Sequence, residues 1–303
     1  METVSHRLKE ITDILTSASE TPALDAQVLL AYILEKPRAW LLAYPEAELS
    51  PKQEKQLLQT VQRLQNGEPL PYILGHWEFF GLDFIVTPAV LIPRPETELL
   101  IEQALEWLRS RPSAHIAADI GTGSGCIAVS LAVHAFNLHF LATDLSLAAL
   151  EIARLNARRH KVADQIDFLQ ADLLKPLNVE RLTDTNNPLT ETNNPLADRI
   201  YPPTFNLIIA NLPYIPTSTL LDLAVYGREP SQALDGGPDG LGLIRRLLAN
   251  APRVLAPGGL LLLEIENRQG PIAKLLAQNA FPYANISVIP DLAGHDRLVR
   301  IEI

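Results

Sequence analysis

The chain has 303 residues with 47% hydrophobic content, enough for about two domains and at least one full core. Its formal net charge of −10 excludes a broad basic surface, so we expect no direct nucleic-acid binding driven by counterion release. The single cysteine, Cys126, excludes an intrachain disulfide. No apolar run is long enough for a membrane span, and the first residues do not resemble a secretory signal, so we expect a cytoplasmic protein.

Residues 1–68 are predicted to form a separate domain, a small bundle of about four helices. Apolar side chains recur three and four positions apart, as at Leu8, Ile11 and Leu15. Ser50 followed by Pro51 is typical of a helix start, because proline suits the first helical position.

Residues 69–98 are predicted to be a hairpin linker. Their aromatic and β-branched residues are interrupted by Gly75 and Gly81, as in two short strands joined by turns. The segment ends with Pro93, Pro95 and two acidic residues ahead of a new helix. We therefore expect a short two-stranded connection between two larger bodies.

Residues 99–303 alternate short apolar runs with helical segments, which predicts an α/β domain with a mostly parallel seven-stranded sheet covered on both faces. The expected strands are 115–120, 140–143, 166–170, 205–210, 260–265, 286–289 and 298–303. The link between the last two is too short for a helical crossover, so the final strand should be antiparallel, at the edge or just inside it. Such a strand is typical of cofactor-dependent methyltransferases rather than NAD dehydrogenases, by fold-level association.

A seven-residue repeat, residues 183–189 and 190–196, interrupts this domain. Its asparagines and prolines do not suit a coiled coil, and the composition is that of a solvated loop. We expect a disordered surface insertion near residues 177–202.

A glycine-rich turn follows the first strand of this domain, where a nucleoside cofactor can approach the backbone. Its residues are Gly121, Thr122, Gly123, Ser124 and Gly125. The spacing is G-x-G-x-G, not the G-x-G-x-x-G of dinucleotide-binding proteins.

Acidic residues at consecutive strand ends strengthen this prediction. Asp144 can accept both hydrogen bonds of a ribose diol, and Asp172 can receive the exocyclic amine of a purine. Asp119 either holds the loop or receives the ammonium group of the cofactor. For each acid alone, a helix N-cap or a surface charge is the alternative.

Cys126 is interpreted as a buried spacer rather than a nucleophile, because no histidine lies near it in sequence. The seven histidines never fall at a metal-ligand spacing with other donors, so no metal site is expected.

The segment Asn211-Leu212-Pro213-Tyr214 closes the apolar run 205–210. The Asn211 side-chain oxygen and the Leu212 carbonyl can accept the two N–H bonds of a planar NH2 group, and Tyr214 can wall the acceptor and face a cation. The arrangement predicts methyl transfer to a planar nitrogen, for which positioning rather than a strong base is needed. A plain turn with a buried tyrosine is the alternative.

Further motifs cover nearly the whole chain in order: residues 71–75, 79–84, 91–98, 119–125, 228–230 with 233–241, and 294–297. Together with the Asn-Leu-Pro-Tyr segment, which resembles the amino-methyltransferase signature Asn-Pro-Pro-Tyr, they resemble the release factor glutamine methyltransferases, the PrmC/HemK family. The resemblance implies a class I S-adenosylmethionine-dependent, Rossmann-like methyltransferase fold. It also implies methylation of the side-chain N5 of the glutamine in the Gly-Gly-Gln motif of class 1 peptide-chain release factors, with the helical N-terminal domain helping to hold the substrate. We expect a monomer.

Carried over by position, the resemblance assigns the following site residues. The cofactor residues are Gly121, Thr122, Gly123, Ser124, Gly125, Asp144, Asp172, Leu173 and Asn211. The substrate glutamine would be bound by Asn211, Leu212, Pro213 and Tyr214, with Asn211, Pro213 and Tyr214 as the catalytic set. The stretch 92–98 can wall the same cleft, with Arg94 and Glu96 interpreted as structural, and residues 228–230 either line it or form an ion pair.

Three residues depart from the family pattern. Leu212 replaces the first proline of the signature, which keeps the accepting carbonyl but loses the φ restriction. Leu173 stands where some members place an aromatic residue against adenine, and Glu266 stands where the family usually has glycine.

Two other functions fit parts of the pattern. Asn-Leu-Pro-Tyr is also the form found in ribosomal-RNA adenine dimethyltransferases, which makes an adenine-N6 RNA methyltransferase the alternative enzyme, although the acidic charge disfavours it. The second is a catalytically inactive scaffold that binds a release factor. The retained Asn211, Pro213 and Tyr214 disfavour it, because a scaffold needs no amide acceptor.

Overall fold

The computed structural model describes residues 3–16, 19, 21–111, 115–135, 137–175 and 204–303. The chain divides into two compact units, Met1–Trp77 and Glu78–Ile303. The predicted insertion near residues 177–202, including its repeat, lies outside the described residues.

The first unit is helical in its described part. Its helices are α1 (Val4–Leu15), α2 (Pro22–Leu34), α3 (Arg38–Ala43), α4 (Pro51–Gln65) and α5 (Leu70–Leu74). Their apolar faces share one core that includes Ile11, Leu29 and Leu57. At the start of α4, the Ser50 side chain accepts from the Gln53 amide and the Gln53 side chain accepts from the Ser50 amide, so two free helix N–H groups are satisfied.

The short helix α5 corrects the predicted start of the hairpin, because residues 70–74 are helical rather than extended. Proline occupies the first turn, and Gly75 ends the helix in the left-handed region at φ 77°. The two-stranded sheet follows as β1 (His76–Phe79) and β2 (Leu82–Ile85). Phe80 and Gly81 between them both have positive φ, as a tight two-residue hairpin turn requires.

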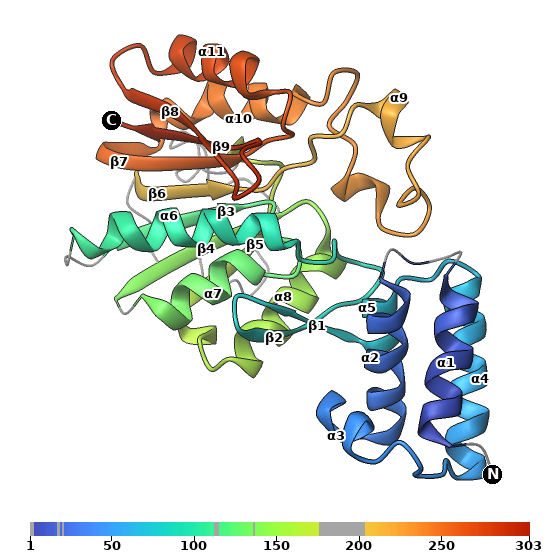
Figure 1. The fold of residues 1–303 in the computed structure, drawn as a ribbon. Helices are drawn as coiled ribbons and strands as arrows, with labels where there is room; N and C mark the ends of the chain where they lie inside the picture. Colours follow the sequence, from blue (N-terminus) through green and yellow to red (C-terminus); the bar gives the residue numbers. More distant parts are fainter. Residues whose placement is uncertain (1–2, 17–18, 20, 112–114, 136, 176–203) are drawn as a thin grey trace. The chain divides into compact units, whose positions relative to one another are not determined.

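The second unit is built on a seven-stranded sheet (Figure 1). Its strands are β3 (His115–Ile120), β4 (Leu138–Asp144), β5 (Ile166–Gln170), β6 (Phe205–Ala210), β7 (Leu255–Glu264), β8 (Asn285–Pro290) and β9 (Asp296–Glu302). The spatial order is β5-β4-β3-β6-β7-β9-β8, with β9 antiparallel to both of its neighbours. The predicted sheet is confirmed, and the final strand lies just inside the edge.

Alternate residues of the strands supply two separate cores. Ala117, Leu207 and Ile209 face one core, whereas Ala118 and Ile208 face the other. This alternation is the period-two pattern of a strand buried on both faces.

Helices cover both faces (Figure 1). The first core takes residues from α6 (Glu98–Arg109), α7 (Cys126–His134) and α8 (Leu147–Arg159). The second takes residues from α10 (Gly242–Asn250) and α11 (Gly270–Ala280). The short helix α9 (Thr217–Leu220) belongs to the long connection between β6 and α10. None of the helices in the described ranges is long and apolar enough to cross a membrane.

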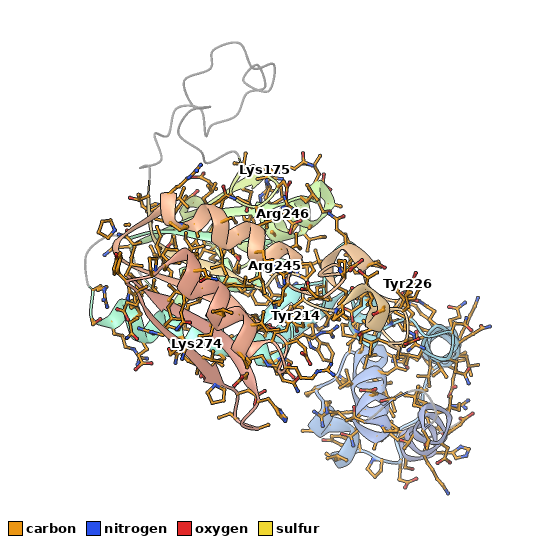
Figure 2. All side chains as sticks on the ribbon, turned by 90° about the horizontal axis from the view of Figure 1, so that it is seen from above. Lys175, Tyr214, Tyr226, Arg245, Arg246 and Lys274 are labelled. Carbon is orange, nitrogen blue, oxygen red and sulfur yellow. The ribbon has the colours of Figure 1, made fainter. Side chains whose placement is uncertain are left out.

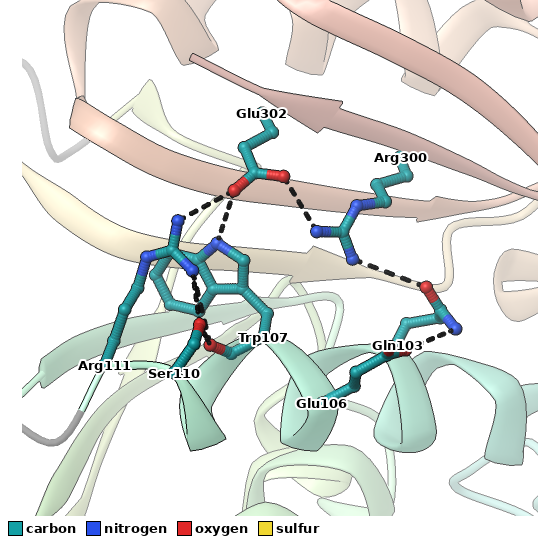
Figure 3. Close-up of polar contacts among 7 residues, drawn as sticks. All are labelled: Gln103, Glu106, Trp107, Ser110, Arg111, Arg300 and Glu302. Atoms are coloured by element: carbon teal, nitrogen blue, oxygen red, sulfur yellow. Dashed lines mark hydrogen bonds and ion pairs between the residues drawn. The ribbon is translucent and has the colours of Figure 1, made fainter.

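A polar cluster joins β9 to α6 (Figure 3). Glu302 accepts hydrogen bonds from the Trp107 indole at 3.1 Å and from the guanidinium groups of Arg111 and Arg300, each at 2.8 Å. Arg300 also donates to the Gln103 side chain at 3.4 Å. These contacts attach the last strand to the first helix of the unit.

Candidate active site

A cleft lies at the carboxyl ends of β3, β4 and β6, where an open α/β sheet binds its ligands. Every predicted site residue except Gly125 and Tyr214 lines it. Those residues are Gly121, Thr122, Gly123, Ser124, Asp144, Asp172, Leu173, Asn211, Leu212 and Pro213. Segments far apart in sequence therefore meet around one cavity.

The glycine loop needs glycine for both its conformation and its packing. Gly121, Gly123 and Gly125 have φ of 78°, 55° and 80°, in the region that side chains disfavour. A Cβ on Gly125 would lie 3.0 Å from the Cβ of Ala153 on α8. The loop thus keeps its backbone exposed to the cleft while α8 packs closely behind it.

Asp119 holds this loop from inside the protein. It is fully buried, and its Oδ2 accepts from the Thr122 hydroxyl at 2.6 Å and from the Ala128 amide at 3.3 Å. Burial raises the pKa of Asp119 to about 7. Of the two roles open to Asp119 from sequence, these contacts fit the loop-holding one.

Asp144 ends β4 and faces the cleft. Its Oδ2 accepts from the Gly123 amide at 2.9 Å, and its Oδ1 accepts from the Ser146 amide at 2.8 Å. Burial raises the pKa of its carboxyl. Because a carboxylate has about four lone-pair sites, each oxygen keeps one for a diol in the cleft.

Asp172 lies two residues beyond the end of β5 and forms ion pairs with Lys175 and Arg246. Figure 2 labels these two cations. These cations, Lys175 foremost, lower the pKa of its carboxyl. The next residue, Leu173, has a φ of 55°, which is uncommon for a residue with a side chain and is typical of functional sites. Asp172 is thus an ionised acceptor, already shared with two cations, at the rim of the cleft.

Asn211 is oriented by a neighbour distant in sequence. Its Nδ2 donates to the hydroxyl of Thr97 at 2.9 Å. Thr97 precedes α6 and is only 2% exposed. Because the amide nitrogen is used in this way, the side-chain oxygen of Asn211 is free to accept from a group in the cleft.

Tyr214 is fixed at both its hydroxyl and its backbone. The hydroxyl donates to Glu264 Oε1 at 3.3 Å, and the Tyr214 carbonyl accepts from the Gln269 side chain at 2.9 Å. Burial, followed by the negative charge of Glu264, raises the pKa of the phenol. Tyr214 is therefore a neutral hydroxyl behind the segment rather than a base.

The motif at residues 233–241 supports the same segment from behind. The Ile215 amide donates to the Leu234 carbonyl at 3.1 Å, and the Gly236 amide donates to the Ile215 carbonyl at 2.8 Å. A Cβ on Gly236 would lie 2.7 Å from the Pro213 carbonyl oxygen, and one on Gly240 would lie 2.1 Å from that of Tyr214. These two glycines are needed because backbone meets backbone there.

Leu212, which departs from the family signature, is buried in the second core. One of its methyl carbons would lie 3.1 Å from a Cβ on Gly121. The leucine therefore packs directly on the glycine loop, which ties the acceptor segment to the cofactor loop.

Arg94 and Glu229 connect two segments at the cleft. The carboxylate of Glu229, which is buried, pairs with Arg94 and accepts from the Ile92 amide at 3.0 Å. Arg94 and Pro230 line the cleft. Residues 92–94 and 229–230 are thus held together by one buried acid, in agreement with the ion-pair interpretation.

Cys126 is buried, and burial raises its pKa to about 12, which fits a spacer rather than a nucleophile. No cluster of metal-binding side chains occurs among the described residues. Glu266, unexplained from sequence, accepts from the backbone amide and the guanidinium of Arg268, both at 3.0 Å, and so stabilises the turn before α11.

Sequence reasoning missed Thr97, Asn156 and Glu264. Asn156 on α8 is fully buried and donates to the carbonyls of Ser124 and Ile85, so it connects the glycine loop to the end of β2. Glu264 directly follows a run of four leucines. A charged residue at the end of a buried apolar strand is uncommon, and this is the sequence signal that indicates a special position.

Two family models match the chain. A PrmC N-terminal domain model matches residues 7–75, and a methyltransferase small domain model matches residues 96–188. Their order along the chain follows the division into a helical unit and an α/β unit.

Curated relatives match nearly the whole chain. A release factor glutamine methyltransferase of Moorella thermoacetica is 44% identical over 92% of this chain and 90% of the relative. One of Coxiella burnetii is 39% identical over 99% of this chain and 98% of the relative. Among solved structures, the hMettl16 catalytic domain in complex with a MAT2A 3'UTR hairpin has a TM-score of 0.53 at 12% identity, covering 82% of this chain and 81% of that one, which supports the fold alone.

Proposed function

The chain belongs to the release factor glutamine methyltransferase family, and from this we infer that it transfers a methyl group from S-adenosylmethionine to the side-chain N5 of a release-factor glutamine. The observation that carries the proposal is the orientation of Asn211 by Thr97, which leaves an amide oxygen for a planar NH2 group. We further propose that the glutamine is that of the Gly-Gly-Gln motif of class 1 release factors.

The residues around the cleft fit the cofactor. The Asp144 carboxylate can accept hydrogen bonds from the ribose diol. The glycines of the Gly121–Gly125 turn have positive φ and carry no side chain, so the cofactor can approach the backbone. Leu173 and Asp172 would contact the adenine, with the Asp172 carboxylate shared between Arg246 and the exocyclic amine. When bound, S-adenosylmethionine supplies a methyl group on a positively charged sulfur, and the electron pair of the broken C–S bond remains on that sulfur.

Asn211 and Leu212 then act on the acceptor. The Asn211 Oδ1 and the Leu212 carbonyl accept the two N–H bonds of the glutamine amide, which aligns the nitrogen lone pair with the methyl carbon. A new N–C bond would form as the C–S bond breaks, and the N–H proton released from the nitrogen would pass to solvent water. Because the lone pair of the amide nitrogen is delocalised, this alignment would supply much of the rate, and the neutral Tyr214 would support the acceptor segment from behind.

The partner assignment rests on the family. The release factor would bring its glutamine between residues 92–94 and 229–230, which Glu229 holds together at the cleft. The helical N-terminal unit is proposed to help bind the same protein. The monomeric state, the cytoplasmic location and the lack of direct nucleic-acid binding remain predictions.

The test uses purified protein, a release factor and S-adenosylmethionine labelled in its methyl group. We expect label in the release factor and none in an acceptor in which the tripeptide glutamine is replaced by glutamate. Label in ribosomal RNA instead would contradict the substrate and favour the RNA alternative. Cofactor and release-factor binding without any transfer would favour the scaffold.

A further inference from the structure

Asn156 is a fully buried polar side chain on α8, and it is not among the residues that line the cleft. Its Oδ1 accepts from the Ile85 amide at 2.7 Å. Its Nδ2 donates to the Ser124 carbonyl at 2.8 Å and to the Ile85 carbonyl at 3.0 Å. An amide nitrogen carries two hydrogens, so both donors of Asn156 are used on backbone.

The orientation of this side-chain amide follows from its partners. The Ile85 N–H group can only donate, so the atom that faces it is the oxygen of Asn156. The carbonyls of Ile85 and Ser124 can only accept, so the atom that faces them is the nitrogen. An ionised aspartate of the same shape has acceptors alone and cannot satisfy these carbonyls.

One face of α8 lies along the glycine loop. Ala149, Ala153 and Asn156 are four and three positions apart, a spacing that places them on the same side of a helix. Ala149 lines the cleft, and a Cβ on Gly125 would lie 3.0 Å from the Cβ of Ala153. Of these three residues Asn156 alone holds the loop by a hydrogen bond, through the carbonyl of Ser124.

The other partner of Asn156 leads into a second part of the cleft. Ile85 is the last residue of β2, and Asn156 meets both its N–H and its carbonyl group, as a neighbouring strand would. The wall segment, residues 89–92, follows shortly after and lines the cleft. Its far end is held at Ile92, whose amide donates to the buried Glu229 at 3.0 Å.

We infer that Asn156 is a positioning residue for the cofactor, which holds the glycine loop and the wall segment at a fixed spacing around the cleft. This role rests on the proposed function, because it assumes that the cleft binds S-adenosylmethionine. Without the amide, the carbonyls of Ser124 and Ile85 lack their donor, and the loop can shift relative to the wall segment. Binding must then order the loop, which weakens the affinity for the cofactor.

The first experiment measures the dissociation constant of S-adenosylmethionine by calorimetry for wild type and Asn156→Asp, each well below its melting temperature. The aspartate keeps the shape and the acceptor for Ile85, but it presents an oxygen to two carbonyl oxygens. The dissociation constant should rise by about 10- to 100-fold, as expected when buried polar groups lose their partner. At saturating cofactor the methylation rate should stay within about fivefold of wild type, because the acceptor segment is unchanged.

A matched control separates positioning from a general effect on the sheet. Asn206 on β6 accepts from the Ile116 amide at 3.1 Å, and it is not among the residues that line the cleft. Asn206→Asp makes the same chemical change next to a backbone N–H group. Its dissociation constant for the cofactor should stay within about twofold of wild type.

A second experiment uses wild type alone and so does not depend on how a variant folds. Amide hydrogen exchange is followed by NMR with and without S-adenosylmethionine. Because Asn156 links the loop to Ile85, cofactor binding should slow exchange of the Ile85 amide by at least about fivefold more than that of the Ile116 amide, which Asn206 holds.

Two outcomes would overturn the inference. One is a wild-type dissociation constant in folded Asn156→Asp, including the case in which only its melting temperature falls, since Asn156 would then be structural. The other is equal slowing of exchange at Ile85 and Ile116. If wild type itself binds no S-adenosylmethionine, the proposed function fails instead, so the two failures are distinguishable.

Discussion

Two buried or half-buried glutamates on neighbouring strands of the same sheet have opposite surroundings. Glu302 on β9 is met by Trp107 and by two guanidinium groups, and the hydrogen bond from Arg300, with those from its other donors, lowers its pKa (Figure 3). Glu264 on β7 accepts a hydrogen bond from the hydroxyl group of Tyr214, and burial raises its pKa to about 7.

The difference distinguishes Glu302, which connects two elements of the fold, from Glu264, which contacts the acceptor segment. The carboxylate of Glu302 is partly exposed, and the guanidinium groups of Arg111 and Arg300 neutralise its charge. This cluster therefore anchors β9 to α6. At Glu264 burial works against the charge, and the hydroxyl group that donates to it belongs to Tyr214 of the acceptor segment. The pH dependence of the unfolding free energy should therefore have opposite signs at the two glutamates.

The largest effect is expected for Asn211→Ala, which removes the acceptor that Thr97 orients. The single-turnover rate should fall by about 100- to 1000-fold, the range seen when one preorganised hydrogen-bonding group is removed. Cofactor binding, measured by calorimetry, should largely remain. A rate within tenfold of wild type would show that the Asn211 side chain does not hold the acceptor nitrogen.

The next prediction concerns how the free energy of unfolding depends on pH. The pKa of Glu264 is raised from 4.5 to about 7 in the folded chain, so its favourable contribution is complete below about pH 4.5 and is lost as pH rises through about 7. Glu264→Gln should flatten the decline of the unfolding free energy in that window, by on the order of 1–3 kcal/mol. Denaturant melts at several pH values measure it.

Glu302 gives the opposite sign in the same melts. Its pKa is lowered, so its contribution is present above the unfolded pKa of about 4.5 and is lost as pH falls through the folded value. Glu302→Gln should change the curve only at acidic pH and leave it parallel to wild type above about pH 5. Equal changes by both variants in one window would contradict the contrast between the two glutamates.

Tyr214→Phe removes the hydroxyl group that donates to Glu264 and keeps the ring behind the acceptor segment. The rate should fall by about 3- to 10-fold, because Thr97 still orients Asn211. The thermal midpoint should fall by a few degrees at pH 8, since the buried carboxylate loses a donor. A loss as large as that of Asn211→Ala would give Tyr214 a direct part in the transfer.

The smallest effect is expected for Leu212→Pro, which restores the family signature. Fixing φ should preorganise the accepting carbonyl and raise the rate by about two- to threefold. The Leu212 contact with the glycine loop is lost at the same time, so the affinity for the cofactor should weaken slightly. A rate decrease would mean that the packing on Gly121 matters more than the φ restriction.

The sheet, its inserted last strand and the residues along the cleft could be predicted because their signals are local. Strand and helix periods lie within single segments, and the glycine loop and Asn-Leu-Pro-Tyr segment are each contiguous. Helix α5 was missed since five residues are too few for a helical period to differ from a strand pattern.

The network behind the site could not be predicted because its members are far apart in sequence. Thr97 meets Asn211 across 114 positions, and Tyr214 meets Glu264 across 50. Only the parallel order of β6 and β7 brings the ends of these strands together. A threonine before a helix and a glutamate after four leucines have no pattern that links them until the sheet is known.

The most direct test is tandem mass spectrometry of a release factor incubated with S-adenosylmethionine and either wild type or Asn211→Ala. We expect one added methyl group on the glutamine of the Gly-Gly-Gln motif with wild type, and the same modification appearing about 100- to 1000-fold more slowly with the variant. A methyl group on any other residue, or none with wild type, would contradict this expectation.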